Sequence, residues 1–360
     1  MTENSFQFSF APIPEKGVLL GWLRQMLLIR EFEVRTMQAY QNRLIGGFCH
    51  IYIGQEAVAV GTIAAVNSDD PIVLAYRDHG HALARGMDPK YCMAEMFGRI
   101  GGCAKGKGGS MHMFDADHHL YGGHGIVSAQ TPLGTGLAFA TKYEDEIIKG
   151  GKSSHVTVCY LGDGALNQGC FYEAMNLASL QDLPVIFVLE NNRYSMGTSI
   201  ERGTSMANDL RVKSEAFGIQ HAIIDGKDVL STYQNFKPIA DWCREESRPF
   251  FVEAQTYRYK GHSMSDPRKY RTRDEESNEE LRDCINTLEQ FLEEEHDVTQ
   301  DSMKQMTRQV KTQVRQAVEW AKNSPEVPLE ELYTDVYTDV WGPYLGTSKP
   351  EMLQDEGDAT

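Results

Sequence analysis

Residues 156–197 read VTVCYLGDGALNQGCFYEAMNLASLQDLPVIFVLENNRYSMG, and the architecture of the chain can be inferred from this stretch. Two apolar runs rich in β-branched residues flank a segment with helical spacing, which predicts a strand, a helix and a second strand. The first strand ends at Gly162-Asp163-Gly164 and the second at Asn191-Asn192. Such a unit makes its two strands parallel, and open parallel sheets bind ligands at the carboxyl ends of their strands.

The same alternation of patterns extends from Gly54 to about Leu332. It predicts strands at 72–76, 185–190 and 250–257. It also predicts helices at 54–66, 89–97 and 171–181. Apolar residues at helical spacing also predict a long helix over 17–45 and two helices after Leu281. We therefore expect an α/β fold with a mostly parallel sheet and helices on both faces. The expected divisions are an arm (1–16), one domain with a C-terminal helical extension (17–345) and a solvated acidic tail (346–360).

The composition limits the classes of partner. With 35 Lys and Arg against 51 Asp and Glu, the net charge of −16 argues against nucleic acid and anionic membranes. The seven cysteines are scattered without a CxxC pair, so neither a disulfide framework nor a thiolate zinc site is predicted. Neither a presequence pattern nor an apolar run of about 18 residues occurs. We expect a cytoplasmic protein, although a processed organellar chain would look the same.

Asp163 and Asn192 follow two strands that we expect to be neighbours, so both side chains can meet at one ion. Their hard oxygen atoms favour Mg²⁺ or Ca²⁺ over zinc, and protein-bound Mg²⁺ commonly shares its ligands with phosphates. Gly162, Gly164 and a helix expected to begin near Asn167 would favour an anion. The sequence therefore predicts a divalent cation with a diphosphate. Either dipeptide alone would be an ordinary turn or cap, and only their shared register favours a ligand.

Residues 100–140 are rich in glycine and histidine and are expected to form a long functional loop. Two phosphate-binding patterns in it are rejected. GGCAKGKG (101–108) has Gly108 where a P-loop needs Ser or Thr, and no strand is expected before it. GTGLAF (134–139) has Phe139 in place of the third glycine of a dinucleotide loop and is likewise expected to follow no strand.

Seven segments together resemble one known family over about residues 17–340. They are GFCHIYIGQEA (47–57), AYRDHGHALARG (75–86), GGCAKGKGGSMHM (101–113), GGHGIVSAQ (122–130), GDGALNQG (162–169), ENNRYSMGTS (190–199) and QTYRYKGHSMSDP (255–267). In this order they resemble the alpha subunits of the decarboxylating component of pyruvate dehydrogenase complexes, in the thiamine-diphosphate-dependent 2-oxo-acid dehydrogenase family. The combination is specific, whereas any one segment alone would not be.

The resemblance implies thiamine diphosphate with Mg²⁺ as cofactors and pyruvate as the substrate. It assigns Mg²⁺ to Asp163, Asn192 and the Tyr194 carbonyl, the diphosphate to Gly164, Ala165, Tyr76 and Arg77, the aminopyrimidine to Gly125 and Val127, and the reacting carbon to His50, His79 and His262, with His262 also at the cofactor. It further implies a beta subunit in an α₂β₂ heterotetramer, which supplies a glutamate at the aminopyrimidine. The acetyl group would pass to a lipoyl-bearing acyltransferase component.

Several alternatives stay open at this point. An acetoin or branched-chain 2-oxo-acid dehydrogenase alpha subunit would share the same motifs. A magnesium-dependent phosphotransferase using Asp163 and Lys107, or an inactive scaffold subunit, are rivals from other classes. A zinc site is a further alternative for the histidines His79, His81, His112, His118, His119 and His124. Their HGH and HH spacings lack the helical i, i+4 pairing of zinc enzymes, and each alone is an ordinary histidine.

Two matched positions carry further alternatives. Tyr76 could serve packing alone, whereas Arg77, at the end of an apolar strand, indicates an anion nearby. Ser263 matches a serine that mitochondrial relatives phosphorylate, and a phosphate there would disturb the loop beside His262. Lys269 precedes Tyr270 where those relatives have a second serine, so we expect a loop that binds cofactor without a kinase.

Overall fold

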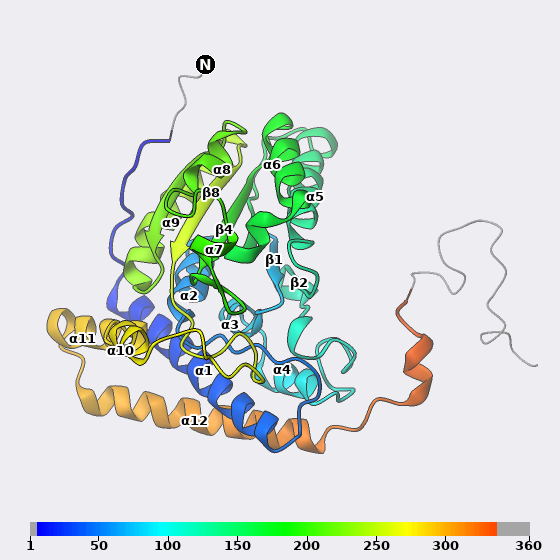
Figure 1. Ribbon diagram of the computed structural model, residues 1–360, viewed down its shortest axis with the longest axis vertical. Coiled ribbons are helices and arrows are strands. Elements are labelled where there is room, and N and C mark those ends of the chain that lie inside the picture. The colour runs from blue at the N-terminus through cyan, green and yellow to red at the C-terminus, as the bar shows by residue number, and fades with distance from the viewer. Residues whose placement is uncertain (1–5, 337–360) are drawn as a thin grey trace, which may run out of the picture.

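The computed structural model describes residues 6–336 of the chain, and a parallel sheet lies at its centre (Figure 1). Across the sheet, the strands are β2 (Leu120–His124), β1 (Ile72–Ala75), β3 (Thr157–Gly162), β4 (Val185–Asn191), β8 (Phe250–Gln255) and β7 (Gln220–Asp225). Every neighbouring pair in this six-stranded sheet is parallel. A separate antiparallel hairpin pairs β5 (Tyr194–Ser195) with β6 (Thr198–Ser199). The predicted α/β fold with a mostly parallel sheet is confirmed.

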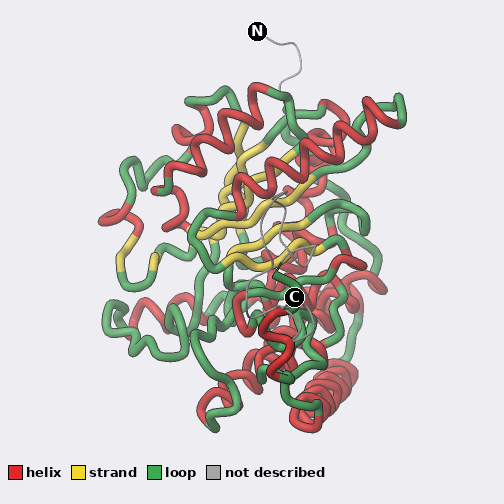
Figure 2. The backbone as a smooth tube through the Cα atoms, turned by 90° about the vertical axis from the view of Figure 1, so that its right-hand side faces the viewer, coloured by secondary structure: helices red, strands yellow, loops and turns green. Residues whose placement is uncertain are grey.

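Helices cover both faces of this sheet, as Figure 2 shows with the strands seen as a twisted layer. They are α1 (Lys16–Gln41), α2 (Glu56–Ala64), α3 (His79–Arg85), α4 (Pro89–Met96), α5 (Gln130–Tyr143), α6 (Gly169–Leu180), α7 (Ile200–Gly203), α8 (Arg211–Glu215), α9 (Val229–Glu246), α10 (Arg273–Glu280), α11 (Cys284–His296) and α12 (Gln300–Asn323). Short turns of 3₁₀ or π helix are η1 (Gly109–Met111), η2 (Ala116–His118), η3 (Glu144–Ile148), η4 (Asp163–Asn167) and η5 (Leu329–Tyr333).

Alternate residues of the inner strands β1, β3, β4 and β8 enter two separate cores. On β3, Val158 and Tyr160 belong to the core that also contains residues of α2 and α9, while Cys159 and Leu161 belong to the core under α5 and α6. All four of these side chains are fully buried. A strand buried on both faces needs apolar residues at consecutive positions, which is why the central strands have continuous apolar sequences.

The N-terminal and C-terminal helices form a second layer below the sheet in Figure 1. Helix α1 packs against α2, α3, α11 and α12, and Leu19, Leu23 and Met26 on its buried face are inaccessible to solvent. Helix α12 runs along α1 and α4 and buries Val310 and Val314. The long N-terminal helix and the two C-terminal amphipathic helices are thus present as predicted.

The prediction of one long loop over residues 100–140 was wrong. This stretch contains η1, η2, strand β2 and the beginning of α5. The expectation that GTGLAF (134–139) follows no strand was also wrong, because β2 precedes the helix that contains these residues. Being inside α5, they form no glycine turn between a strand and a helix. Strand β2 reads LYGGH, and its two glycines made it look like a loop.

Two smaller differences concern β7 and α6. Strand β7, at the edge of the sheet, was not predicted, because its burial is partial and its polar residues interrupt the pattern. Helix α6 begins at Gly169 and not near Asn167, since residues 163–167 form the 3₁₀ turn η4 first. The division into arm, domain and tail stays a prediction, and the tail at 346–360 lies outside the described residues.

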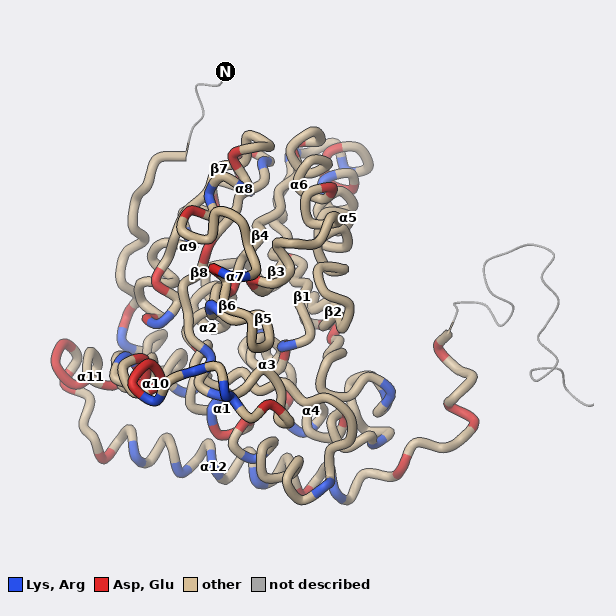
Figure 3. Tube along the Cα trace, in the orientation of Figure 1, with Lys and Arg blue, Asp and Glu red and all other residues tan. Residues whose placement is uncertain are grey.

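The charged residues lie mainly on the peripheral helices and loops, while the central strands carry few (Figure 3). Acidic side chains gather on α10, whose sequence is RDEESNEE. Within residues 6–336, none of the helices combines the length and the apolar character needed to cross a membrane.

Candidate cofactor site at the carboxyl ends of the central strands

Four adjacent strands, β1, β3, β4 and β8, end at one edge of the sheet. Their registers pair Gly162 with Glu190 and Asn191 with Gln255, so the strand ends are level with one another. Because the strands are parallel, the segments that follow them begin side by side. These segments carry most of the predicted site residues, namely Tyr76 and Arg77, Asp163 to Ala165, Asn192 to Tyr194, and His262.

The three predicted metal ligands lie on adjacent segments at this edge. Asp163 is buried, and its Oδ2 atom has no hydrogen-bond partner among the described residues. Burial raises the pKa of this carboxyl, while a hydrogen bond from Ser195 opposes that shift. The Asn192 Oδ1 atom and the Tyr194 carbonyl oxygen both accept from Nη1 of Arg258, at 3.2 and 3.3 Å.

The Nδ2 atom of Asn192 fixes the orientation of its side-chain amide. Its Nδ2 atom donates to Oε1 of Gln55 at 3.1 Å, so Oδ1 points the opposite way, toward Arg258 and the backbone N–H of Tyr194. One carboxylate oxygen without a partner, one amide oxygen and one carbonyl oxygen make a donor set that suits a hard divalent cation. The types of donor therefore fit Mg²⁺, which would have to displace Arg258 from two of these oxygens.

Gly164 and Ala165 begin the turn η4 directly after β3. A Cβ atom added at Gly164 would lie 2.6 Å from Oγ of Ser195, closer than any side chain tolerates. This contact explains the glycine, because the chain at Gly164 must pass close to the β5–β6 hairpin. The hairpin also contains Tyr194, so the close approach keeps its carbonyl beside the end of β3.

Arg77 connects three segments of the site. It donates from Nη1 to the carbonyl oxygen of Ile51 and from Nη2 to that of His262, each at 2.7 Å. Burial lowers the pKa of its guanidinium, and nearby acidic groups oppose that shift. The guanidinium has further N–H groups besides these two, so it can also face an anion. The ring centre of its neighbour Tyr76 lies 4.6 Å from the ring centre of His50 and 5.8 Å from that of His262.

His50 and His262 face each other with ring centres 5.1 Å apart. Within residues 6–336, the Nδ1 atoms of both rings lack a hydrogen-bond partner although they are buried. Burial, followed by the charge of Arg77, lowers the pKa of His50 to about 2 and that of His262 to about 3. Both rings are therefore neutral at pH 7 and can donate or accept hydrogen bonds.

His79 occupies a different place from the other two predicted catalytic histidines. It is fully buried, and both ring nitrogens are engaged, Nδ1 with Glu33 at 3.0 Å and Nε2 with the carbonyl oxygen of Ser110 at 2.9 Å. The structure brings His50 and His262 together but places His79 behind His50, with Ser110 between them. Both nitrogens of His79 thus contact protein atoms here, and its place at the reacting carbon stays a prediction.

The predicted aminopyrimidine contacts lie in the loop between β2 and α5. Gly125 lies beside the His112 ring, and Val127 is exposed. Ser128 follows with a φ of +70°, a left-handed conformation that favours glycine. Its carbonyl oxygen accepts from Sγ of Cys170 at 3.5 Å, which links this loop to the start of α6.

Ser263 lies in the loop after His262, and its Oγ is 3.0 Å from Oγ of Ser265. Asp266 holds this loop, since its carboxylate accepts from the backbone N–H of His262 at 2.6 Å and from the Tyr270 hydroxyl at 2.6 Å. A phosphate on Ser263 would add charge directly beside this arrangement. Whether that happens stays a prediction.

Sequence reasoning missed several residues of the site, and they are Glu33, Gln55, Arg258 and Asp266. Arg258 is buried, and its neighbours Arg77 and Arg271 help to lower its pKa to about 10, after burial itself. A possible signal was its place directly after β8 between two aromatic residues, Tyr257 and Tyr259. Glu33 gave no such signal, because it lies on the N-terminal helix.

The histidines weighed as a zinc set have separate partners. His81 contacts Glu190 and Tyr52, His112 contacts the Gly123 carbonyl, and His118 pairs with Asp115. No group of three or more His, Cys, Asp or Glu side chains suited to a metal occurs in the part of the chain that the structure describes.

The glycine-rich segment 101–109 surrounds a carboxylate of the chain itself. The two oxygens of Glu95 accept from the backbone N–H groups of Ala104, Gly106, Gly108 and Gly109 at 2.7 to 3.1 Å. These N–H groups are therefore already satisfied by an internal anion. These four N–H groups are therefore not available to a phosphate in this arrangement.

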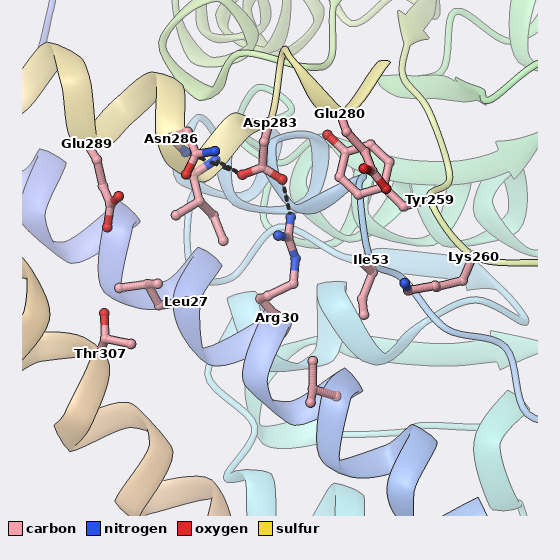
Figure 4. A pocket seen from close by; sticks show the side chains of 12 residues that line it. Leu27, Arg30, Ile53, Tyr259, Lys260, Glu280, Asp283, Asn286, Glu289 and Thr307 are labelled. Carbon is pink, nitrogen blue, oxygen red and sulfur yellow. Dashed lines mark hydrogen bonds and ion pairs between the residues drawn. The ribbon is translucent and has the colours of Figure 1, made fainter. Parts of the chain in front are cut away.

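A pocket of about 590 Å³ opens between α1 and the beginning of α11 (Figure 4). Arg30 lies in it with Asp283, and the two form an ion pair of 2.9 Å. Tyr259 and Lys260 belong to its lining, but none of the predicted site residues does. The candidate site is thus defined by the strand ends and not by this pocket.

Comparison with known proteins agrees with the geometry. Residues 24–330 match the family described as "Dehydrogenase E1 component". The chain is 46% identical over 321 residues to "Pyruvate dehydrogenase E1 component subunit alpha" of Rickettsia bellii, covering 89% of this chain and 96% of that protein. The protein of the same name from Rhizobium meliloti is 46% identical (86% and 87% covered), and that from Zymomonas mobilis is 49% identical (78% and 79% covered). A match of this extent shows that the chain belongs to the dehydrogenase E1 component family.

Proposed function

We propose that this chain is the alpha subunit of a pyruvate dehydrogenase E1 component. It would decarboxylate pyruvate with thiamine diphosphate and pass the acetyl group to a lipoyl group of the acyltransferase component. The observation that carries the proposal is the buried, unpartnered Oδ2 of Asp163 at the end of β3, the strand that pairs with β4, after which Asn192 and Tyr194 follow. The names of the similar proteins from three bacterial genera support pyruvate as the substrate.

The diphosphate half of the site would be built by the segments after β1, β3 and β4. Asp163, Asn192 and the Tyr194 carbonyl would hold Mg²⁺, whose charge would neutralise the diphosphate. Gly164 and Ala165 would approach the phosphate oxygens without a bulky side chain. Arg77 would contribute a charged donor from the side, with Tyr76 packed next to it.

Thiamine diphosphate, when bound, supplies the carbanion chemistry by which the carboxyl group is lost. Gly125 and Val127 would offer backbone groups to the aminopyrimidine. His50 and His262 would face the substrate as neutral rings and donate hydrogen bonds to its carboxylate or carbonyl oxygens. Their burial would exclude water from one side of the reacting carbon.

The partners belong to the same proposal. The chain would pair with a beta subunit in an α₂β₂ heterotetramer, and the beta subunit would supply the glutamate at the aminopyrimidine. The exposed side chains of Ile126 and Val127 are consistent with a loop that a second subunit covers. A cytoplasmic location and a Ser263 loop that functions without a kinase remain predictions.

Reconstitution with the beta subunit tests the proposal. We expect decarboxylation of pyruvate, measured with an artificial electron acceptor, to need both chains and both cofactors. Full activity of the alpha chain alone, or kcat/KM values that favour acetoin or branched-chain oxo acids, would contradict it. Asp163→Ala should abolish the activity of the complex, whereas a scaffold subunit would tolerate this change.

The phosphotransferase alternative has no structural support. Lys107 is bound to Thr334, Glu331 and Asp335 at the surface, and the adjacent N–H groups are occupied by Glu95. Binding of ATP in place of thiamine diphosphate, measured by calorimetry in the presence of Mg²⁺, would revive that alternative.

A further inference from the structure

We infer that Glu33 and His79 form a buried ion pair that positions His50 through Ser110, which makes Glu33 a positioning residue of the site. The part that concerns catalysis rests on the proposed function. The part that concerns the ion pair stands on the structure alone.

Glu33 lies on α1 and is inaccessible to solvent. Its two carboxylate oxygens are 3.0 and 3.1 Å from Nδ1 of His79, and one of them also accepts from the backbone N–H of Tyr52 at 2.9 Å. A buried carboxylate is costly unless it is paired and hydrogen-bonded, and these contacts meet both conditions. These contacts therefore offset the cost of burying the Glu33 side chain.

The protonation of His79 follows from its partners. The carboxylate of Glu33 and the carbonyl oxygen of Ser110 can only accept hydrogen bonds, and they lie at opposite nitrogens of the ring. The Ser110 Oγ, which can donate, lies at the same Nε2 atom, so it is the pairing with Glu33 at Nδ1 that favours an imidazolium. Burial alone would lower the pKa of His79, but the charge and hydrogen bond of Glu33 outweigh it and raise the pKa. Asp78, the adjacent acidic group, acts in the same direction.

Ser110 transmits this arrangement to His50. Its Oγ lies 2.9 Å from Nε2 of His79 and accepts from the backbone N–H of His50 at 3.2 Å. The His50 ring itself has an Nδ1 atom without a partner in the described part of the chain, so its position depends on its backbone and on the packing of Tyr76 and His262. A fixed backbone at His50 thus fixes the side chain that would face the substrate.

The ion pair also affects the charge of His50. Burial is the largest cause of its lowered pKa, and Arg77, His262, His79 and Arg258 then lower it further. Replacing Glu33 with glutamine would remove the reason for His79 to stay charged. The positive charge behind His50 would then disappear, and His50 would accept a proton at higher pH than in the wild type.

The test uses the assembled α₂β₂ complex carrying Glu33→Gln. We expect kcat for pyruvate to fall about 10- to 100-fold, as for loss of other groups that orient a functional residue, with KM and thiamine diphosphate affinity within about threefold. The acid limb of the kcat/KM profile should move to higher pH. Glu33→Asp, which keeps the carboxylate, should recover part of kcat. Activity within twofold of the wild type, or a loss with an unshifted pH profile, would overturn the inference.

A double-mutant cycle tests the ion pair without any turnover. Thermal unfolding of the cofactor-free complex is compared for Glu33→Gln, His79→Gln and the double variant, because each single change leaves the other group buried and unpaired. We expect the double variant to be no less stable than either single variant. Additive losses would overturn the inference even if a single variant assembles poorly. A complex that pairs these residues but does not decarboxylate pyruvate would refute the proposed function alone.

Discussion

Gly162 on β3 lies directly opposite Glu190 on β4 in the parallel register of the sheet. Each of these residues is followed within two positions by a predicted metal ligand, Asp163 after Gly162 and Asn192 after Glu190. The register thus places a carboxylate and an amide from different strands at one edge, where we propose that they share an ion. A shift of one residue would turn the side chains to the other face of the sheet.

Replacement of Asp163 by asparagine should separate binding from stability. We expect Asp163→Asn to weaken the affinity of the complex for thiamine diphosphate with Mg²⁺ about 10- to 100-fold, because one anionic ligand is lost. The unfolding temperature without cofactor should not fall, since the Oδ2 atom has no partner to lose. Titration by quenching of tryptophan fluorescence, with thermal unfolding, measures both quantities. The exposed Asp117→Asn is the matched control, and equal affinities in both variants would exclude Asp163 as a ligand.

Glu95 should prove essential for the glycine-rich segment. A glutamine there cannot accept four N–H bonds with one oxygen, so Glu95→Gln should lower the free energy of unfolding by about 2–4 kcal/mol. Limited trypsin digestion should cleave faster at Lys105 and Lys107. Glu173→Gln, at an exposed position of α6, should change neither quantity. Unchanged cleavage and stability in Glu95→Gln would show that this carboxylate does not organise the segment.

Asp78 should make stability depend on pH. Burial raises the pKa of this carboxyl to about 7, so its contribution to stability is complete below about pH 4 and is lost as the pH rises through 7. Asp78→Asn cannot ionise and can still accept from the Met113 N–H, which the wild-type carboxylate binds at 2.9 Å. The variant should therefore gain about 1–4 kcal/mol relative to the wild type between pH 5 and 8. Urea unfolding at several pH values measures this, and parallel curves for the two proteins would refute it.

The folded chain should be more stable with glycine than with serine at position 128. Its φ of +70° is unfavourable for a residue with a Cβ, so Ser128→Gly should stabilise the chain by about 0.5–1 kcal/mol. Ser128→Ala keeps the strain and loses the contact of 3.3 Å with Oγ1 of Thr131, so it should be slightly destabilising. Chemical denaturation of the wild type and the two variants measures their free energies of unfolding. A loss of stability in the glycine variant would show that the serine side chain outweighs the strain.

The sequence predicted the strands that are buried on both faces, because β3, β4 and β8 have continuous apolar residues. Strand β2 escaped prediction because its glycines serve packing. A Cβ at Gly122 would lie 2.1 Å from the Phe114 ring, and one at Gly123 would lie 1.9 Å from Oδ2 of Asp78. Packing of this kind depends on residues that are separated in the sequence and meet only in the fold. The composition of the strand alone therefore suggests a loop.

The site was predictable where its residues end apolar strands, as Asp163 and Asn192 do. The residues that support His50 could not be predicted, because Glu33 and Ser110 belong to segments without any motif that links them. The buried Arg258 was also missed, since an arginine in a sequence is expected at the surface. Motifs at strand ends thus give the ligands, while the residues that orient them emerge only from the tertiary structure.

The strand order has a consequence for how the protein is made. The loops of the site follow β1, β3, β4 and β8, and these strands span residues 72–255 although they are adjacent in the sheet. During synthesis, β4 is made before β8. The edge of β4 that pairs with β8 therefore stays exposed until β8 has been made. Contacts between such distant residues slow folding and leave strand edges open to aggregation. Nascent chains that stop short of Gln255 should therefore need a chaperone, and neither they nor any shorter fragment would hold the cofactor.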